Sequence, residues 1–156
     1  MRDEQELDPR VAAAFYGRFA DLRPAQAAAI RPLLDGRNVV LSSGTGSGKT
    51  EAVMAPLVSR VWRGALRHGR LAILYVAPTK ALANDLEKRL APPLATLGLK
   101  IGVRHGDRDD LSHGQIPHVL LTTPESLDVL LFRHDQAIMS VEAVVVDEVH
   151  LLYNTQ

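Results

Sequence analysis

Continuous apolar runs alternate with helical patterns along the chain. The runs that predict strands cover residues 39–41, 71–76, 119–121 and 143–146, and a weaker run covers 100–104. They are unbroken rather than alternating, which is typical of strands buried on both faces of a sheet. Because helical patterns separate them, the order predicts an α/β fold: a mostly parallel sheet with right-handed crossovers and helices on both faces.

The helical patterns cover residues 51–66 and 80–90, and in the second Leu82, Leu86 and Leu90 recur every four residues on one face. Two further helices are predicted before the first strand, at 9–19 and 24–34. Pro24 opens the latter, and Asp35-Gly36 ends it. The polar segment 105–117 predicts an exposed loop. No linker or repeat divides the chain, so residues 1–156 are expected to form one domain.

Composition agrees with a single globular domain. The chain has 156 residues, 46% hydrophobic and 23% charged, which suffices for one core. The absence of cysteine excludes disulfides and thiolate chemistry and fits a cytoplasmic protein. No apolar run is long enough to span a bilayer, and no signal segment is expected from the charged start of the sequence. Since 18 basic residues balance 18 acidic ones, any nucleic-acid binding must be local. The densest basic stretch, 60–70, is most simply a solvated helix end.

The segment 42–50, SSGTGSGKT, lies between a predicted strand and a predicted helix. Its glycines let the backbone curl around a polyphosphate, Lys49 can reach the terminal phosphates, and Thr50 can offer a hydroxyl to Mg²⁺. The strict pattern has glycine where this chain has Ser43, which is small enough for the turn. An ordinary glycine-rich turn is the alternative. The loop predicts an ATP and Mg²⁺ site at Ser43, Gly44, Thr45, Gly46, Ser47, Gly48, Lys49 and Thr50.

Polar segments follow every strong strand, so they are expected to share the carboxyl edge of the sheet, where such sheets bind ligands. Asp147 follows the run 143–146 and can hold Mg²⁺ through water, together with Thr50, while Glu148 can orient or deprotonate the water that attacks the γ-phosphate. Lys49, Asp147 and Glu148 are the catalytic candidates. Taken alone, DEVH is more often a surface acidic turn. His150 is expected to couple nucleotide state to neighbouring segments rather than to bind metal.

The motifs SSGTGSGKT, APTKALAND, TTPESL and DEVH occur in an order that resembles the first RecA-like domain of superfamily two helicases of the DEAD/DEAH-box type. The segments RPAQAAAI, HGD and TTPESL look most like the large helicase-related proteins. The resemblance covers nearly the whole chain and implies a RecA-like P-loop fold. It implies that Gln26 reads the adenine edge, and Phe15 or Phe19 is a weaker candidate for stacking on the base, with core packing the commoner role of such rings.

The resemblance also implies a nucleic-acid site that grips one strand by its phosphates. The matching residues are Pro78, Thr79, Lys80, Arg104, Gly106, Thr123, Pro124 and Glu125. Backbone N–H groups and hydroxyls suffice for such contacts, so a neutral domain can make them. Thr79 and Thr123 also precede predicted helices, where they can serve as caps, and the two roles are compatible.

The resemblance further implies a serine-alanine-threonine segment after DEVH and a second RecA-like domain with arginine fingers, as a partner of this one. Without them the RecA-like fold is incomplete, and the chain alone is expected to hydrolyse ATP negligibly and not to unwind a duplex. The missing strand would leave the strands 39–41 and 143–146 to pair directly, or to borrow a strand by self-association. The expected function is that of an ATP-dependent helicase or a duplex translocase; a nucleotide switch for a protein partner is the alternative.

Overall fold

The computed structural model describes residues 7–46, 48–133 and 135–153. Two compact units divide the chain, Met1–Trp62 and Arg63–Gln156. We describe each unit by itself, and the expectation of one domain over residues 1–156 stays a prediction. No helix among the described residues is long and apolar enough to cross a membrane.

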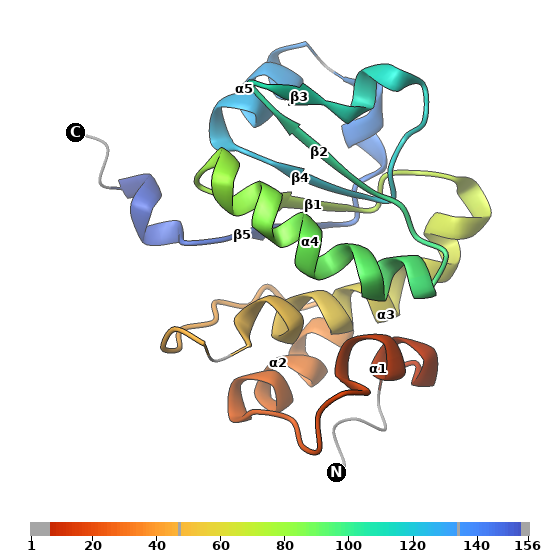
Figure 1. The fold of residues 1–156 in the computed structure, drawn as a ribbon, viewed down its shortest axis with the longest axis vertical. Helices are drawn as coiled ribbons and strands as arrows, with labels where there is room; N and C mark the ends of the chain where they lie inside the picture. Colours follow the sequence, from red (N-terminus) through yellow and green to blue (C-terminus); the bar gives the residue numbers. More distant parts are fainter. Residues whose placement is uncertain (1–6, 47, 134, 154–156) are drawn as a thin grey trace. The chain divides into compact units, whose positions relative to one another are not determined.

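The first unit is built from helices (Figure 1): α1 (Pro9–Tyr16), α2 (Pro24–Leu34) and the greater part of α3 (Lys49–His68). Asp8 caps α1 by accepting a hydrogen bond from the backbone N–H of Arg10, and α2 begins at a proline in its first turn. Val11, Ile30 and Val58, one from each helix, are fully buried in the core. The predicted helices are therefore present, with ends that shift by a few residues.

The second unit contains a five-stranded sheet in the order β3-β2-β4-β1-β5. The strands are β1 (Ile73–Val76), β2 (Ile101–His105), β3 (Arg108–Asp109), β4 (Val119–Thr122) and β5 (Ala143–Val146). All pairs are parallel except β2–β3, so the arrowheads of the other four strands point to one edge (Figure 1). The α/β, mostly parallel fold expected from the sequence is confirmed.

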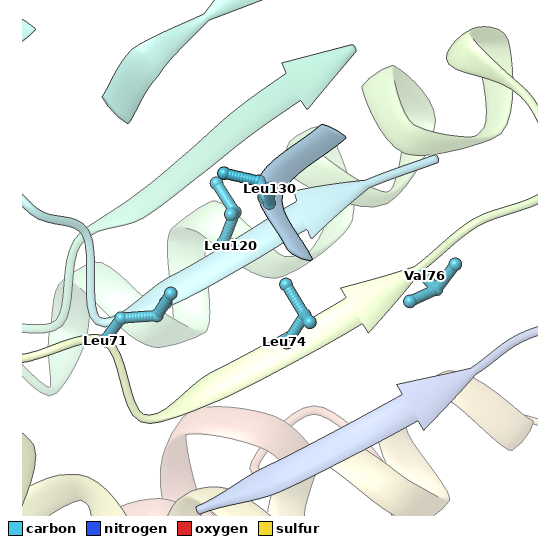
Figure 2. Packing of buried hydrophobic residues seen from close by; sticks show 5 residues of the cluster. All are labelled: Leu71, Leu74, Val76, Leu120 and Leu130. Atoms are coloured by element: carbon cyan, nitrogen blue, oxygen red, sulfur yellow. The ribbon is translucent and has the colours of Figure 1, made fainter. Parts of the chain in front are cut away.

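Helices cover both faces of this sheet. Leu74 of β1 and Leu120 of β4 pack with Leu130 of α5 (Pro124–Phe132), as Figure 2 shows, with α4 (Lys80–Thr96) behind the strands. The short 3-10 helix η3 (Gln136–Ser140) supplies Ile138 to the same cluster. Because Leu74 and Leu120 are buried there and their neighbours Tyr75 and Leu121 are buried too, β1 and β4 are buried on both faces, as expected. In β5, by contrast, Val144 and Val146 are exposed, so the expectation that this strand is buried on both faces is wrong.

Two expectations about the backbone are wrong. Residues 38–44 form no strand, and Val40 is 92% exposed, so the strand that was expected at 39–41 as a partner for 143–146 is absent. A strand needs a hydrogen-bonded neighbour, and an apolar run alone does not supply one. The polar segment 105–117 is not a plain loop: it contains β3 and the 3-10 helix η2 (Asp110–His113).

An arginine explains why the segment 105–117 is ordered. Arg108 donates to both carboxylate oxygens of Glu87, at 2.7 and 2.8 Å, and also to the carboxylate of Asp110. The hydrogen bonds to Glu87 and then to Asp110 raise the pKa of Arg108 above its ordinary value. Asp110 in turn accepts from the backbone N–H of Val103 on β2. This bidentate network ties β3 and η2 to α4 and β2.

Candidate nucleotide and nucleic-acid sites

A hydrogen bond joins the two ends of the phosphate loop in the first unit. The ammonium of Lys49, the first residue of α3, donates to the backbone carbonyl of Ser43 at 2.9 Å. Gly46 and Gly48 have φ values of 72° and 74°, a left-handed conformation that glycine adopts without strain. The 20-residue helix α3 begins at the end of this loop, so its positive N-terminus lies where an anion would bind. Ser47 lies outside the described residues.

Gln26 contacts this loop. Its carboxamide oxygen accepts from the backbone N–H of Arg23 at 2.9 Å, and its nitrogen donates to the carbonyl of Gly48 at 3.4 Å. The side chain is 5% exposed. A Cβ added at Gly48 would come 2.4 Å from the Gln26 nitrogen, so a larger residue there would displace the end of the Gln26 side chain and break its hydrogen bond to the loop. The structure thus brings Gln26 to the loop, while its selection of adenine stays a prediction.

The other residues predicted for nucleotide binding in the first unit differ in burial. Thr50, in the first turn of α3, is 8% exposed. Phe15 is buried at 5% exposure and belongs to the core, whereas Phe19 is 55% exposed. The core role is therefore the one that Phe15 has. Gly44 and Thr45 are exposed on the loop.

The acidic pair lies in the second unit, directly after β5. The carboxylate of Asp147 accepts from the hydroxyl of Tyr75 at 2.9 Å and from the backbone N–H of Glu148 at 2.9 Å. Glu148 is the one non-glycine residue with positive φ in the described part of the chain, at 49°. Such backbone strain is concentrated at functional sites. His150 lies 3.4 Å from the Glu148 carboxylate, and its coupling role stays a prediction.

The oxygen ligands present suit Mg²⁺ bound together with a nucleotide. Among the described residues no cluster of three or more His, Cys, Asp or Glu side chains could enclose a metal. Mg²⁺ does not need such a cage, because it keeps several waters and uses one or two carboxylates plus phosphate oxygens. Thr50 of the first unit carries a hydroxyl and Asp147 of the second unit carries a carboxylate, which are oxygens of the kind that Mg²⁺ binds, and their joint role at one ion stays a prediction.

A groove of about 420 Å³ lies at the carboxyl ends of the strands of the second unit. It gathers the residues after β1, those after β2 and the first turns of α5. Its lining residues are Pro78, Thr79, Lys80, Gly106, Thr123, Glu125, Ser126 and Val129. Six of the eight residues predicted to contact nucleic acid therefore meet in one groove, although they come from three separate segments.

The remaining two predicted contacts are placed differently. Arg104 of β2 does not line the groove: its side chain is 11% exposed and lies 3.3 Å from the carboxylate of Asp109. Pro124 occupies the first turn of α5, beside the groove residues Thr123 and Glu125. Ser126 and Val129 also line the groove and were not predicted from the sequence. The helical repeat is the signal that could have found them, because Ser126 is three positions after Thr123 and Val129 is four after Glu125.

Thr79 and Lys80 in the groove have side-chain partners within the chain. Thr79 caps α4, its hydroxyl accepting from the backbone N–H of Leu82 at 3.2 Å, whereas Thr123 precedes α5 without a side-chain capping bond. Lys80 forms an ion pair of 3.1 Å with Asp107, and its ammonium lies 3.0 Å from where a Cβ of Gly106 would be. The capping role expected of Thr79 is confirmed, and the side-chain cap expected of Thr123 is absent.

Comparison with known proteins identifies the class. The model of the DEAD/DEAH box helicase family matches residues 23–156. The ATP-dependent helicase Lhr-Core of Methanothermobacter thermautotrophicus is 36% identical over 167 residues, covering 94% of this chain and 19% of the relative. The Lhr helicase/probable uracil glycosylase of Mycolicibacterium smegmatis is 35% identical, covering 91% of this chain and 11% of the relative.

A solved structure agrees with this class. The crystal structure of DUF1998 helicase MrfA bound to DNA and AMPPNP has a TM-score of 0.79 and 27% identity, covering 94% of this chain and 22% of that one. The chain belongs to the DEAD/DEAH box helicase family. It spans about a fifth of the length of the Lhr-Core relatives it matches.

Proposed function

We propose that this chain is the ATP-binding and nucleic-acid-binding part of an ATP-dependent helicase or translocase. The groove is the observation that carries the proposal, because three separate segments at the carboxyl edge of one sheet converge there with two helix N-termini. Helix N-termini and backbone N–H groups favour phosphate without needing a net positive charge. The solved relative bound to DNA and AMPPNP supports the same two ligands.

In the proposed site each residue has one task. The loop N–H groups and the Lys49 ammonium bind the phosphates, and the first turn of α3 adds its positive end. Asp147 and Thr50 would hold Mg²⁺, which neutralises charge on the phosphates when it is bound. Glu148 orients the attacking water and accepts its proton. Gln26, at the same loop, selects adenine.

Nucleotide binding is tested with thermal unfolding of the chain in Mg-ATP and Mg-ADP. A ligand that binds only the folded form raises stability by RT ln(1 + [L]/Kd), about 2.7 kcal/mol at a hundredfold excess over Kd. Lys49→Ala is expected to abolish the rise. Lys88→Ala, which removes an exposed lysine from α4, is the matched control and should keep it. A rise that persists in Lys49→Ala would place the nucleotide elsewhere.

Nucleic-acid binding is tested separately with a single-stranded oligonucleotide at several salt concentrations. Affinity should fall with salt at a slope of about −0.7 per phosphate contacted, and Lys80→Ala should reduce that slope by about one contact while Lys88→Ala leaves it unchanged. Binding without salt dependence, or none, would favour a nucleotide switch for a protein partner. Unwinding itself is measured on a helicase that also carries the second RecA-like domain.

A further inference from the structure

A buried tyrosine holds the carboxylate that follows β5. Tyr75 lies in the middle of the sheet on β1 and is 2% exposed. Its hydroxyl donates to Oδ2 of Asp147 at 2.9 Å, across 72 positions of sequence. A buried hydroxyl without a partner is costly, so this tyrosine depends on an acceptor at that point. The acceptor is the residue proposed to hold Mg²⁺.

The parallel register of β1 against β5 brings the Tyr75 hydroxyl to the Asp147 carboxylate. Tyr75 pairs with Val145 of β5, and Asp147 lies two residues further along the same strand direction. Residues two apart in an extended chain point to the same face, so Asp147 projects on the face that carries Tyr75. The backbone N–H of Asp147 donates to the carbonyl of Val76 at 2.9 Å, which extends the ladder by one step past β5. Both the backbone and the side chain of Asp147 are thus fixed by β1.

The two oxygens of Asp147 are held by different donors. Oδ2 accepts from Tyr75, and Oδ1 accepts from the backbone N–H of Glu148 at 2.9 Å. A carboxylate has about four acceptor positions, so each oxygen keeps one for a further ligand. The tyrosine donor is neutral, and it therefore orients the carboxylate without cancelling its charge. The result is an oriented anion with free lone pairs.

We infer that Tyr75 is a positioning residue for Mg²⁺: it holds the Asp147 carboxylate in the orientation that binds the ion or its water. This inference rests on the proposed function, since it assigns Asp147 to Mg²⁺. Partners that hydrogen-bond a metal-binding carboxylate fix its direction, and their loss typically costs about 10- to 100-fold in metal affinity or activity. In this role Tyr75 acts through Asp147 and does not contact the metal. Its removal therefore weakens Mg²⁺ binding, and nucleotide binding then needs a higher Mg²⁺ concentration.

The test measures ATP affinity of the 156-residue chain as a function of Mg²⁺, using a fluorescent ATP analogue. Tyr75→Phe keeps the ring and removes the hydroxyl. We expect this variant to need about tenfold or more Mg²⁺ to reach half of the Mg²⁺-dependent gain in ATP affinity. The ATP affinity measured in excess EDTA should stay unchanged. Ser140→Ala is the matched control, because its hydroxyl donates to the carbonyl of Leu71 at 2.8 Å, at the opposite end of the same strands.

A double-mutant cycle separates positioning from a general loss of stability. In the Asp147→Asn background, Tyr75→Phe should produce no further change in the Mg²⁺ requirement, because the carboxylate that it orients is gone. A Tyr75→Phe curve that overlays that of the unsubstituted chain, or one matched by Ser140→Ala, would overturn the inference and leave the proposed function standing. ATP binding that is absent or independent of Mg²⁺ in the unsubstituted chain would overturn both.

Discussion

Two apolar segments of similar composition have opposite fates in this chain. Residues 119–122 form the strand β4, which has a parallel neighbour on each side, and Leu120 is fully buried. Residues 39–41, which precede the phosphate loop, form no strand, and Val40 is 92% exposed. The first segment lies in the sheet unit and the second in the helical unit.

The difference teaches that an apolar run becomes a strand only where neighbours complete its hydrogen bonds. A helix pairs its own backbone groups and forms from local sequence, as α1, α2 and α3 do in the first unit. A strand pairs only with another segment. The phosphate loop therefore relies on side-chain contacts, those of Lys49 with Ser43 and of Gln26 with Gly48, where a strand would otherwise anchor it.

The largest expected effect comes from truncating a buried side chain of β4, with an exposed side chain of the segment 39–41 as the comparison. Leu120→Ala removes a fully buried side chain between two strands and should lower the free energy of unfolding by about 2–5 kcal/mol. Val40→Ala should change it by less than about 0.5 kcal/mol, as an exposed substitution does. Urea denaturation measures both. If Val40→Ala costs as much as a core substitution, the segment 39–41 is paired in solution and the contrast between the segments disappears.

The same contrast explains what the sequence could predict. The apolar runs located β1, β2, β4 and β5 because each has a neighbour, and helical spacing located α2 with its ends unchanged. The antiparallel strand β3 was missed, because Arg108 and Asp109 carry no apolar signal and are ordered by the ion pairs of Arg108. Pairing and charge networks depend on residues far away in sequence, which local patterns do not reveal.

The residues of the candidate site were likewise predictable where local motifs mark them, and their long-range contacts were not. Motif order located the phosphate loop, the acidic pair and six of the groove residues. The acidic pair and the groove residues follow strand ends, whereas the phosphate loop was recognised from its glycines, Lys49 and Thr50 alone. Motif order did not reveal that Tyr75 meets Asp147, because that contact depends on the register of β1 against β5. It also placed Arg104 among nucleic-acid contacts, whereas the structure pairs its side chain with Asp109. The roles of all these residues stay predictions.

A second prediction concerns Gly48, one of the two left-handed glycines of the phosphate loop. Gly48→Ala should destabilise the first unit by about 1–3 kcal/mol, because a left-handed non-glycine residue is strained and the new Cβ would meet the Gln26 nitrogen at 2.4 Å. Gly44→Ala is the control, with no atom within 4 Å of its Cβ and no positive φ. Thermal unfolding compares them. Equal, small losses would mean that the loop does not hold the conformation described for Gly48.

The sheet unit has a matching left-handed residue in Glu148, where the expected effect is smaller and opposite in sign. Glu148→Gly should raise the free energy of unfolding by about 0.5–1 kcal/mol, because glycine accepts a φ of 49° without strain. Glu148→Ala removes the same carboxylate but keeps the strained backbone, so it should give no gain. Urea denaturation of the pair isolates the backbone contribution. A loss of stability in the glycine variant would show that the Glu148 side chain matters more than its φ.

The smallest expected effect is a pH dependence confined to the sheet unit, since residues 1–62 contain no histidine. His118 is buried, and its Nδ1 accepts from the backbone N–H of Lys100 at 2.8 Å, which requires an unprotonated nitrogen there. Burial, and then the charge of Lys100, lower the pKa of His118 below its ordinary value of 6.5. The unfolded chain therefore binds the proton more readily than the folded one. The stability from this group is complete above pH 6.5 and is lost as the pH falls through that value toward the lowered pKa.

Hydrogen exchange at pH 7.5 and pH 5.5, corrected for the intrinsic rates, measures where that loss occurs. Amides of β4, next to His118, should lose protection at the lower pH, whereas those of α1 and α2 should keep theirs if the two units open separately. His118→Gln retains a side-chain acceptor without a titrating group, so it should flatten the response of β4. A parallel loss in α1, α2 and β4 would mean that the helical and sheet units unfold as one cooperative body, and the contrast between them would then be one of structure and not of stability.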